Sequence, residues 1–189
     1  MKQVVLINAD INKSAITQAL MDAYRHGAGQ AEAVIKEIAI ADLKFNPNKS
    51  LPNKLADAEQ DLNEAIDKIR WSNHIVIFCP VYKDSIHFKI KGFFDRIFLP
   101  DQVFVINQPH FSNDFAGRSA RIVSILDEAA WHDWQNSQRT TYLAIKRSVL
   151  EKCRIKPVLT NTIGYLYSLD NAYAQKWLKK LHDFGRKGI

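Results

Sequence analysis

Short apolar runs alternate along the chain with longer segments in which apolar residues recur every three or four positions. Continuous apolar runs between turn residues are typical of strands buried on both faces, whereas the longer stripes are typical of helices that pack one face on a sheet. The runs predict five strands, at residues 3–8, 33–40, 74–79, 119–126 and 156–162. The stripes predict five helices, at residues 14–26, 55–71, 88–98, 137–153 and 171–186.

Turn residues mark the boundaries of these elements. Gly27 and Gly29 predict the end of the first helix, because glycine commonly follows a helix. Two prolines and three asparagines predict a loop at residues 44–53, and a longer loop is predicted at residues 99–117. A loop of that length in a compact domain is usually functional or packed against a partner.

Strands and helices alternate without internal repeats, which predicts an α/β fold with a parallel sheet covered by helices on both faces. The length of 189 residues suits one domain, so we predict a single domain over residues 1–189. Five strands favour the doubly wound order 2-1-3-4-5, in which ligands bind at the carboxyl ends of strands 1 and 3. The loops at residues 8–14 and 80–85 are therefore expected to lie side by side.

The composition, 47% hydrophobic and 24% charged residues, is typical of a soluble globular protein. The longest apolar run, at residues 75–82, is much shorter than the ~20 residues of a membrane-spanning helix. The apolar stretch at residues 4–7 is too short for a signal peptide. We expect a cytoplasmic protein without membrane insertion.

The net charge of +6 comes entirely from the second half of the chain. Residues 1–95 carry 12 basic and 12 acidic side chains, and residues 96–189 carry 14 and 8. A basic half can indicate nucleic-acid binding, but no basic run here is interleaved with aromatic residues as in RNA-binding surfaces. The excess charge is interpreted as solvated helix faces that favour small anions, and no nucleic-acid partner is expected.

Neither the cysteines nor the histidines form a recognisable metal or redox motif. Cys79 and Cys153 belong to no CxxC pair, and the six histidines show no HxxxH or mixed His/Cys spacing. Cys79 ends a strongly apolar run and is interpreted as a core residue, with a redox-active thiol as the alternative. No metal site is predicted.

The first loop, NADINKS at residues 8–14, precedes a helix whose first N–H groups can bind an anion such as phosphate. Asn12 and Ser14 can add side-chain donors, and Lys13 a positive charge. The alternative is that Asn12 or Ser14 only caps the helix. Asp10 disfavours an anion in this loop unless its carboxylate points away.

The second loop, PVYKDS at residues 80–85, follows the third strand. Pro80 and Tyr82 offer a flat apolar surface next to backbone N–H groups, which suits a planar heteroaromatic ring. The chain contains neither GxGxxG after the first strand nor a GxxxxGK[ST] loop, which argues against a Rossmann dinucleotide site and a P-loop. Lys91 and Asp95, four residues apart on the next helix, are expected to form a surface ion pair.

The segment PVYKDSIHFKIKGFFDRIF, residues 80–98, resembles the strand-3 loop and following helix of the flavodoxin-like NAD(P)H:quinone oxidoreductases and related NADPH-dependent flavin reductases. Those proteins carry a P-[LV]-[YW] turn followed by K-x-[FW]-x-D-R. The segment FAGRSARIVSIL, residues 115–126, resembles the glycine-basic approach to strand 4 in the quinone reductase branch. The resemblance extends over nearly the whole chain and implies a flavodoxin-like fold.

The resemblance implies a flavin cofactor, FMN with FAD as the alternative, held by three loops. FMN is favoured because the chain is short and has little extra sequence to hold an adenine. Tyr82 and Lys83 are expected nearest the chemistry, with Lys83 stabilising the charge of the reduced ring. The implied flavin-binding residues are Asn8, Asn12, Ser14, Ala15 and Ile16 for the phosphate; Pro80, Val81, Tyr82 and Lys83 for the ring; and Leu126, Asp127 and Glu128 in the third loop.

The implied activity is the transfer of a hydride from NAD(P)H through bound flavin to a quinone or a similar small acceptor. The resemblance also implies a homodimer with the flavin near its interface. Residues 99–117, Trp131 and Trp134 would then form a wall of the site or a contact surface, and ordinary core packing is the alternative for them.

The third loop favours a different function. In the related reductases this loop is rich in threonine, serine and glycine, whereas LDEAA, residues 126–130, is acidic and lacks glycine. Two carboxylates beside a reduced, anionic flavin would oppose binding, so the alternative is a flavin-poor regulatory or interaction subunit of the same fold. An electron-transfer flavodoxin fits less well, because those proteins are typically acidic and this chain is basic.

Overall fold

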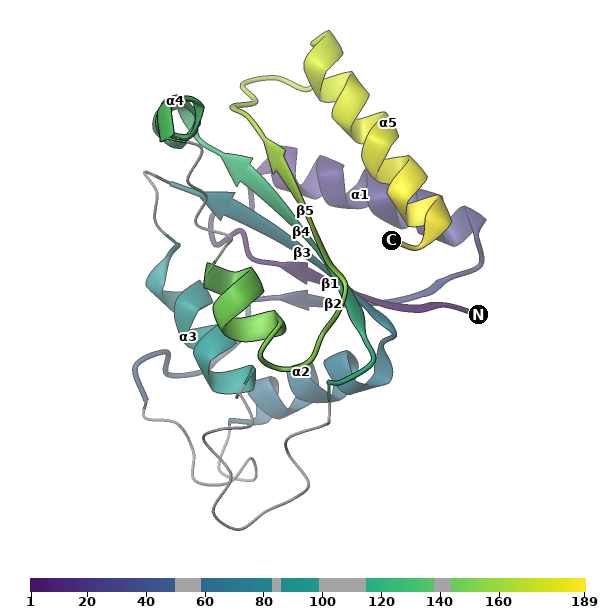
Figure 1. The fold of residues 1–189 in the computed structure, drawn as a ribbon, viewed down its shortest axis with the longest axis vertical. Coiled ribbons are helices and arrows are strands. Elements are labelled where there is room, and N and C mark those ends of the chain that lie inside the picture. The colour runs from purple at the N-terminus through teal and green to yellow at the C-terminus, as the bar shows by residue number, and fades with distance from the viewer. Residues whose placement is uncertain (50–58, 83–85, 99–114, 138–143) are drawn as a thin grey trace.

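The computed structural model describes residues 1–49, 59–82, 86–98, 115–137 and 144–189. In these ranges the chain forms a parallel five-stranded sheet (Figure 1). The strands are β1 (Gln3–Asn8), β2 (Val34–Ala39), β3 (His74–Val81), β4 (Ser119–Leu126) and β5 (Val158–Ile163). Their order in the sheet, β2-β1-β3-β4-β5, confirms the predicted doubly wound order 2-1-3-4-5.

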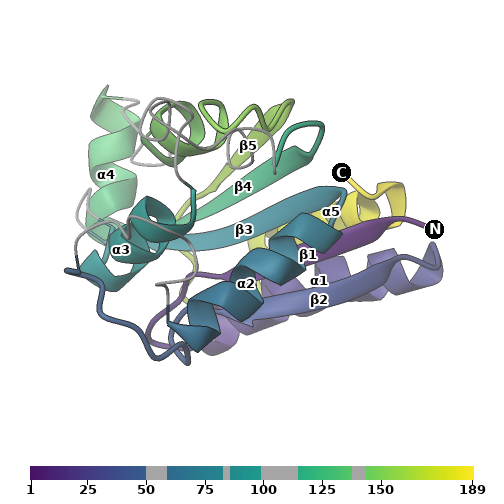
Figure 2. The ribbon, with the colours of Figure 1, turned by 90° about the horizontal axis from the view of Figure 1, so that it is seen from below.

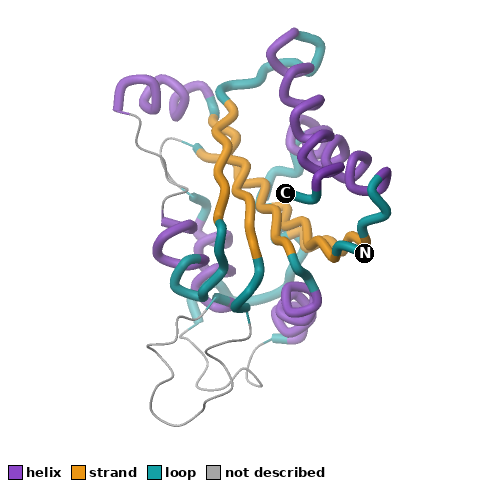
Figure 3. The backbone as a smooth tube through the Cα atoms, turned by 45° about the vertical axis from the view of Figure 1, so that its right-hand side comes forward, coloured by secondary structure: helices purple, strands orange, loops and turns teal. Residues whose placement is uncertain are grey.

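Helices cover both faces of the sheet, as Figures 2 and 3 show from two further directions. One face carries α1 (Ala15–Gln30) and α5 (Ala172–Lys187). The other face carries α2 (Gln60–Trp71), α3 (Phe88–Ile97) and the short π-helix η3 (Ala144–Leu150). The remaining helix, α4 (Glu128–Ser137), follows β4 at the end of the sheet toward which the strands point (Figure 1).

The strands divide the core into two clusters, because successive residues of a strand point to opposite faces. Val5 and Ile7 of β1 belong to the cluster under α2 and α3, whereas Val4 and Leu6 belong to the cluster under α1 and α5. All four side chains are fully buried. Complete burial of one such side chain contributes about 1.5–3 kcal/mol, which explains why the strands are continuous apolar runs.

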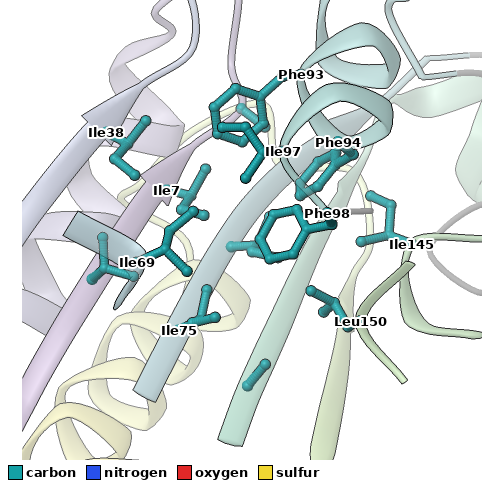
Figure 4. Packing of buried hydrophobic residues seen from close by; sticks show 14 of the residues in the cluster. Ile7, Ile38, Ile69, Ile75, Phe93, Phe94, Ile97, Phe98, Ile145 and Leu150 are labelled. Atoms are coloured by element: carbon teal, nitrogen blue, oxygen red, sulfur yellow. The ribbon is translucent and has the colours of Figure 1, made fainter. Parts of the chain in front are cut away.

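Aromatic side chains fill the layer between α3 and the sheet. Figure 4 shows Phe93, Phe94 and Phe98 among the isoleucines of this cluster, with Ile145 and Leu150 of η3 nearby. The ring of Phe94 lies 5.4 Å from that of Phe93 and 5.7 Å from that of Phe98, measured between centroids. These ring contacts lie within α3 and its C-cap residue, and burial of the same rings against the sheet residues of the cluster fixes α3 on the sheet.

The first helix does not end at Gly27 and Gly29 as predicted, because α1 continues to Gln30. Gly27 faces α5, and a Cβ atom at this position would lie 1.9 Å from the carbonyl oxygen of His182. The glycine therefore allows two helix backbones to approach each other and does not stop the first of them.

The predicted helix at residues 137–153 is confirmed only over Ala144–Leu150, which form the π-helix η3. A helix, α4, already begins at Glu128, where a loop was expected, and η3 ends at Leu150. Residues 138–143 lie outside the described ranges, as do residues 55–58 of the predicted second helix and residues 99–114 of the predicted long loop. Helix α4 starts early because the carboxylate of Asp127 caps it.

Strand β3 continues beyond its predicted end at residue 79 to Val81. Pro80 ends neither the strand nor its pairing, because the register pairs Pro80 with Ile125 and Val81 with Leu126 of β4. The second loop therefore begins at Tyr82, farther along the chain than predicted.

Cys79 is a core residue, as predicted. Its side chain is 1% exposed, and burial raises the pKa of its thiol to about 12. A thiol with such a pKa stays protonated at neutral pH, which argues against the redox alternative. Within the described ranges no three His, Cys, Asp or Glu side chains are grouped as metal ligands, and no helix there combines the length and apolarity needed to cross a membrane.

Candidate functional site

A buried carboxylate organises the loop between β1 and α1. Asp10 is 1% exposed, and its Oδ1 accepts a hydrogen bond of 2.9 Å from the backbone N–H of Asn12. Its Oδ2 accepts bonds of 3.0 and 2.6 Å from the backbone N–H and the hydroxyl of Ser14. Two backbone donors and one hydroxyl therefore converge on an anion that belongs to the chain itself. Hydrogen bonds to a charged acceptor are roughly twice as strong as neutral ones.

The side chains at the two ends of this loop, Asn8 and Ser14, each accept a hydrogen bond from a nearby backbone N–H. The side-chain oxygen of Asn8 accepts a hydrogen bond of 2.9 Å from the N–H of Asp10. The hydroxyl oxygen of Ser14 accepts one of 3.2 Å from the N–H of Thr17. Ser14 is thus the N-cap of α1, as the alternative interpretation of this residue predicted.

The first turn of α1 supplies further donors. The N–H groups of Ala15 and Ile16 have no partner within the helix, because the helix begins at Ala15. The ammonium group of Lys13 forms an exposed ion pair with Asp42, which directs its charge to the surface. An anion that approaches α1 therefore meets a helix terminus whose preceding loop already holds a carboxylate.

The loops after β1 and β3 meet, as the predicted strand order required. The side-chain amide of Asn12 donates a hydrogen bond of 3.2 Å to the hydroxyl oxygen of Tyr82. Tyr82 is 37% exposed, whereas Pro80 and Val81 are buried as the last residues of β3. The accessible aromatic surface is thus the ring of Tyr82 and not that of Pro80, and Lys83 lies outside the described residues.

The surroundings of Tyr82 keep its phenol protonated. Partial burial is the main cause that raises its pKa, and the negative charges of Asp10 and Asp127 raise it further. The hydrogen bond from Asn12 acts in the opposite direction. Because an ordinary phenol already titrates near pH 10, Tyr82 is a neutral hydrogen-bonding group at physiological pH.

The predicted third flavin loop is the beginning of a helix. Leu126 ends β4, and Glu128 begins α4. Between them, the carboxylate of Asp127 accepts a hydrogen bond of 2.7 Å from the N–H of Ala130. The N–H of Asp127 donates one of 3.1 Å to the carbonyl oxygen of Val81. Asp127 therefore caps α4 and ties its start to the end of β3.

Replacement of Asp127 by alanine is expected to lower the free energy of unfolding by about 1 kcal/mol, because the N–H of Ala130 loses its side-chain acceptor. Asp127→Asn keeps an acceptor in the same place and is expected to cost less. Urea unfolding followed by circular dichroism measures both variants. Equal losses for the two would mean that the carboxylate charge, and not the cap, stabilises α4.

Two tryptophans of α4 pack where β3 and β4 end. Trp131 and Trp134 stack with ring centroids 5.1 Å apart and planes inclined by 12°. Both pack against the buried side chains of Val81, Leu126 and Ala130, and both are half-buried. The packing supports the core alternative for these residues, and it places an aromatic pair beside the end of the strand that leads to Tyr82.

The charged residues of the K-x-[FW]-x-D-R motif form one exposed and one buried ion pair. Lys91 and Asp95 form the expected exposed ion pair. Arg96 is 2% exposed and donates hydrogen bonds of 2.8 Å to the carboxylate of Glu59 and 3.0 Å to the carbonyl oxygen of Asn46. Because Glu59 is the N-cap residue of α2, Arg96 joins α3 to the start of α2.

The donors of the loop after β1 are already engaged, whereas the ring of Tyr82 is accessible. The loop donors of Asn12 and Ser14, which the resemblance assigned to the flavin phosphate, are bonded to Asp10. The exposed ring of Tyr82, in contrast, is a surface on which a heteroaromatic ring can stack. An accessible ring is therefore present for a flat ligand, and the loop donors assigned to the flavin phosphate already bind Asp10.

Known proteins share this fold over nearly the whole chain. A family model described as flavodoxin-like fold matches residues 2–183. Smu.1420 from Streptococcus mutans UA159 has a TM-score of 0.74 at 18% identity, covering 99% of this chain and 100% of that chain. The NAD(P)H:quinone oxidoreductase from Methanothermobacter marburgensis has a TM-score of 0.70 at 14% identity, covering 97% of this chain and 94% of that chain.

A third similar structure contains a flavin. The FMN-dependent NADH-azoreductase from Bacillus anthracis str. Ames Ancestor, solved in complex with FMN, has a TM-score of 0.66 at 14% identity and covers 99% of each chain. No curated protein sequence matches this chain significantly. At such identities a similar structure establishes the fold alone. The family model extends over most of the chain, and the protein therefore belongs to the family with the flavodoxin-like fold.

Proposed function

We propose that this protein is a flavin-dependent oxidoreductase that transfers a hydride from NAD(P)H to a quinone or a similar small acceptor. The observation that carries the proposal is the 3.2 Å hydrogen bond from Asn12 to Tyr82. It joins the loops at the carboxyl ends of β1 and β3, where doubly wound folds bind their ligands. Relatives named NAD(P)H:quinone oxidoreductase and FMN-dependent NADH-azoreductase support the choice of reaction.

Tyr82 is the residue to which we assign the flavin ring. Asn12 holds its hydroxyl, its phenol is neutral, and its ring is accessible for stacking. The hydride chemistry is that of flavin and nicotinamide, and the chain contributes orientation and shape. Lys83 keeps the role implied by the resemblance, as the proposed partner of negative charge on the reduced ring.

The proposal extends to the form of the protein. We assign it a single domain over residues 1–189 that acts in the cytoplasm as a homodimer, with small molecules as its other partners. Both FMN and FAD are included as cofactors, because the contact that we assign to a described residue, stacking on Tyr82, is to the ring that both share.

Flavin retention tests the proposal directly. The purified protein is mixed with FMN, FAD or riboflavin, and the dissociation constant is measured from the quenching of flavin fluorescence. Tyr82→Ala is expected to weaken binding about fivefold to tenfold through loss of the stacking surface. Tyr167→Ala, which removes a 74% exposed tyrosine of the segment after β5, is the matched control and is expected to leave binding unchanged.

The reaction is tested on the same samples. With flavin present, consumption of NADH or NADPH is followed at the nicotinamide absorbance band, with and without a soluble benzoquinone. We expect consumption that depends on flavin, on quinone and on Tyr82. A folded protein that binds none of the three flavins would contradict the proposal.

The second candidate is a flavin-poor regulatory or interaction subunit of the same fold. Two observations favour it: Asp10 is bonded to loop donors after β1, and Asp127 caps a helix where a third flavin loop was expected. The fluorescence titration separates the candidates, because this one requires that the folded protein bind no flavin at micromolar concentrations.

A further inference from the structure

The loop after β1 has the donor pattern of an anion site, and that site is filled from within. Successive backbone N–H groups before a helix form a concave nest that binds phosphate and other anions. In this chain the N–H groups of Asn12 and Ser14, together with the hydroxyl of Ser14, all donate to the carboxylate of Asp10. Asp10 is 1% exposed, so its carboxylate lies inside the loop and not at its rim.

A flavin phosphate would face two obstacles here. Its oxygens would compete with a covalently attached carboxylate for the same donors, and the two negative charges would repel each other at short range. Lys13, the cation within the loop, is directed to the surface by its ion pair with Asp42. An uncharged ribityl chain meets neither obstacle, because it carries no charge and needs no anion nest.

We propose that the carboxylate of Asp10 takes the place of the flavin phosphate, so that the site selects flavins by their ring and ribityl chain and binds FMN no more tightly than riboflavin. This inference rests on the proposed function for its ligand class. It goes beyond that function in naming a phosphate-free flavin as the preferred form and Asp10 as the residue that determines the preference.

The test compares the affinities for FMN and riboflavin in four proteins: the wild type, Asp10→Ala, Asp10→Asn and Asp22→Ala. In the wild type the dissociation constant for FMN is expected to equal or exceed that for riboflavin. Asp10→Ala removes the charge and releases three donors, so FMN is expected to gain at least about tenfold over riboflavin. Asp10→Asn removes the charge but still fills the nest, so a smaller gain is expected.

Asp22→Ala is the matched control. It deletes one carboxylate of α1 that is ion-paired with Arg25 on the surface, at 49% exposure, and it touches neither Lys13 nor the three donors. The ratio of the two affinities is expected to stay at the wild-type value. A shift in Asp22→Ala as large as in Asp10→Ala would show that net charge alone sets the preference, and would overturn the inference.

A second measurement needs no flavin. Inorganic phosphate is titrated into each protein, and the midpoint of thermal unfolding is recorded. Asp10→Ala is expected to be stabilised by millimolar phosphate, which can bind the donors that Asp10 no longer occupies, whereas the wild type and Asp22→Ala are not. If Asp10→Ala does not fold, the affinity ratio of Asp10→Asn carries the test, and an unchanged ratio overturns the inference.

The outcomes separate the inference from the function on which it rests. Wild-type protein that binds FMN at least about tenfold more tightly than riboflavin would overturn the inference and leave the oxidoreductase proposal standing. If phosphate stabilises Asp10→Ala but the protein binds no flavin, the first result supports Asp10 as the group that occupies the nest. The second result contradicts the oxidoreductase proposal. Absence of both effects would overturn both.

Discussion

Replacement of Glu59 by alanine is expected to lower the free energy of unfolding by about 3–5 kcal/mol, because it leaves the guanidinium of Arg96 buried without its carboxylate. Arg96 is 2% exposed, and one of its terminal nitrogens lies 2.8 Å from Oε1 of Glu59 while the other lies 2.5 Å from Oε2. The carbonyl of Asn46 accepts a further bond of 3.0 Å from the guanidinium, which does not offset the lost charge.

The effect should depend on pH in a definite direction. The hydrogen bond from Arg96 is the main cause that lowers the pKa of Glu59 to about 2, from an ordinary value of 4.5. Because the folded-state pKa lies below the unfolded-state value, the stabilisation is present above about pH 4.5 and is lost as the pH falls toward 2. The difference between wild type and Glu59→Ala in urea unfolding should therefore shrink between pH 5 and pH 2.

Asp95→Ala is the control for this prediction. Asp95 is adjacent to Arg96 in the chain, but its ion pair with Lys91 is exposed at both partners. Exposed pairs contribute about 0–1 kcal/mol, so the variant is expected to unfold at nearly the wild-type urea concentration. A loss for Glu59→Ala no larger than for Asp95→Ala would show that Arg96 is hydrated or finds another acceptor.

The strand order and the meeting of the two loops could be predicted because both follow from patterns repeated over whole elements. Each apolar run needs two covered faces, and the order of five such strands brings Asn12 next to Tyr82. Individual side-chain contacts cannot be predicted in this way, because they depend on how two elements pack. Asp95 and Arg96 are adjacent charged residues of one helix, and the sequence alone does not show which of them is exposed. The packing of α3 against the start of α2 leaves Asp95 exposed and buries Arg96.

The sequence raises the question of where the Asp10 carboxylate points in the first loop, but it does not answer it. In the sequence, Asp10 opposes an anion in this loop unless its carboxylate points away, and that direction depends on the local backbone. Lys13 adopts a left-handed conformation, with φ of 52°, which bends the loop just before Ser14. A left-handed lysine is uncommon, so no propensity argument would have placed the carboxylate inside the loop.

The sequence contains a local signal for the start of α4, and this signal conflicts with the family resemblance. Asp127 followed by Glu128 is a typical helix start, an N-cap residue followed by an acid in the first turn. The resemblance implies a flavin loop at the same residues, so the two interpretations conflict. The bond from Ala130 to the Asp127 carboxylate shows that the local signal was the better guide here.

Introduction of a methyl group at Gly27 is expected to lower the free energy of unfolding by about 2–3 kcal/mol. A Cβ atom there would lie 1.9 Å from the carbonyl oxygen of His182 in α5, well inside van der Waals contact. Gly185 of α5 is in the reciprocal position, where a Cβ would lie 2.1 Å from the carbonyl oxygen of Tyr24 in α1. Both obstacles are backbone atoms that cannot rotate away, so the two helices would have to separate.

Gly29→Ala is the matched control, because Gly29 lies in the same helix and a Cβ there would meet nothing within 4 Å. Alanine favours a helix interior over glycine by about 1 kcal/mol, so this variant is expected to raise stability while Gly27→Ala lowers it, as measured by urea unfolding. Gly27→Ala with Gly185→Ala should cost less than the sum of the two single losses, because one substitution already separates the helices. Stabilisation by Gly27→Ala equal to that by Gly29→Ala would show that the crossing of α1 and α5 tolerates wider spacing, and that the close approach is not what holds these helices together.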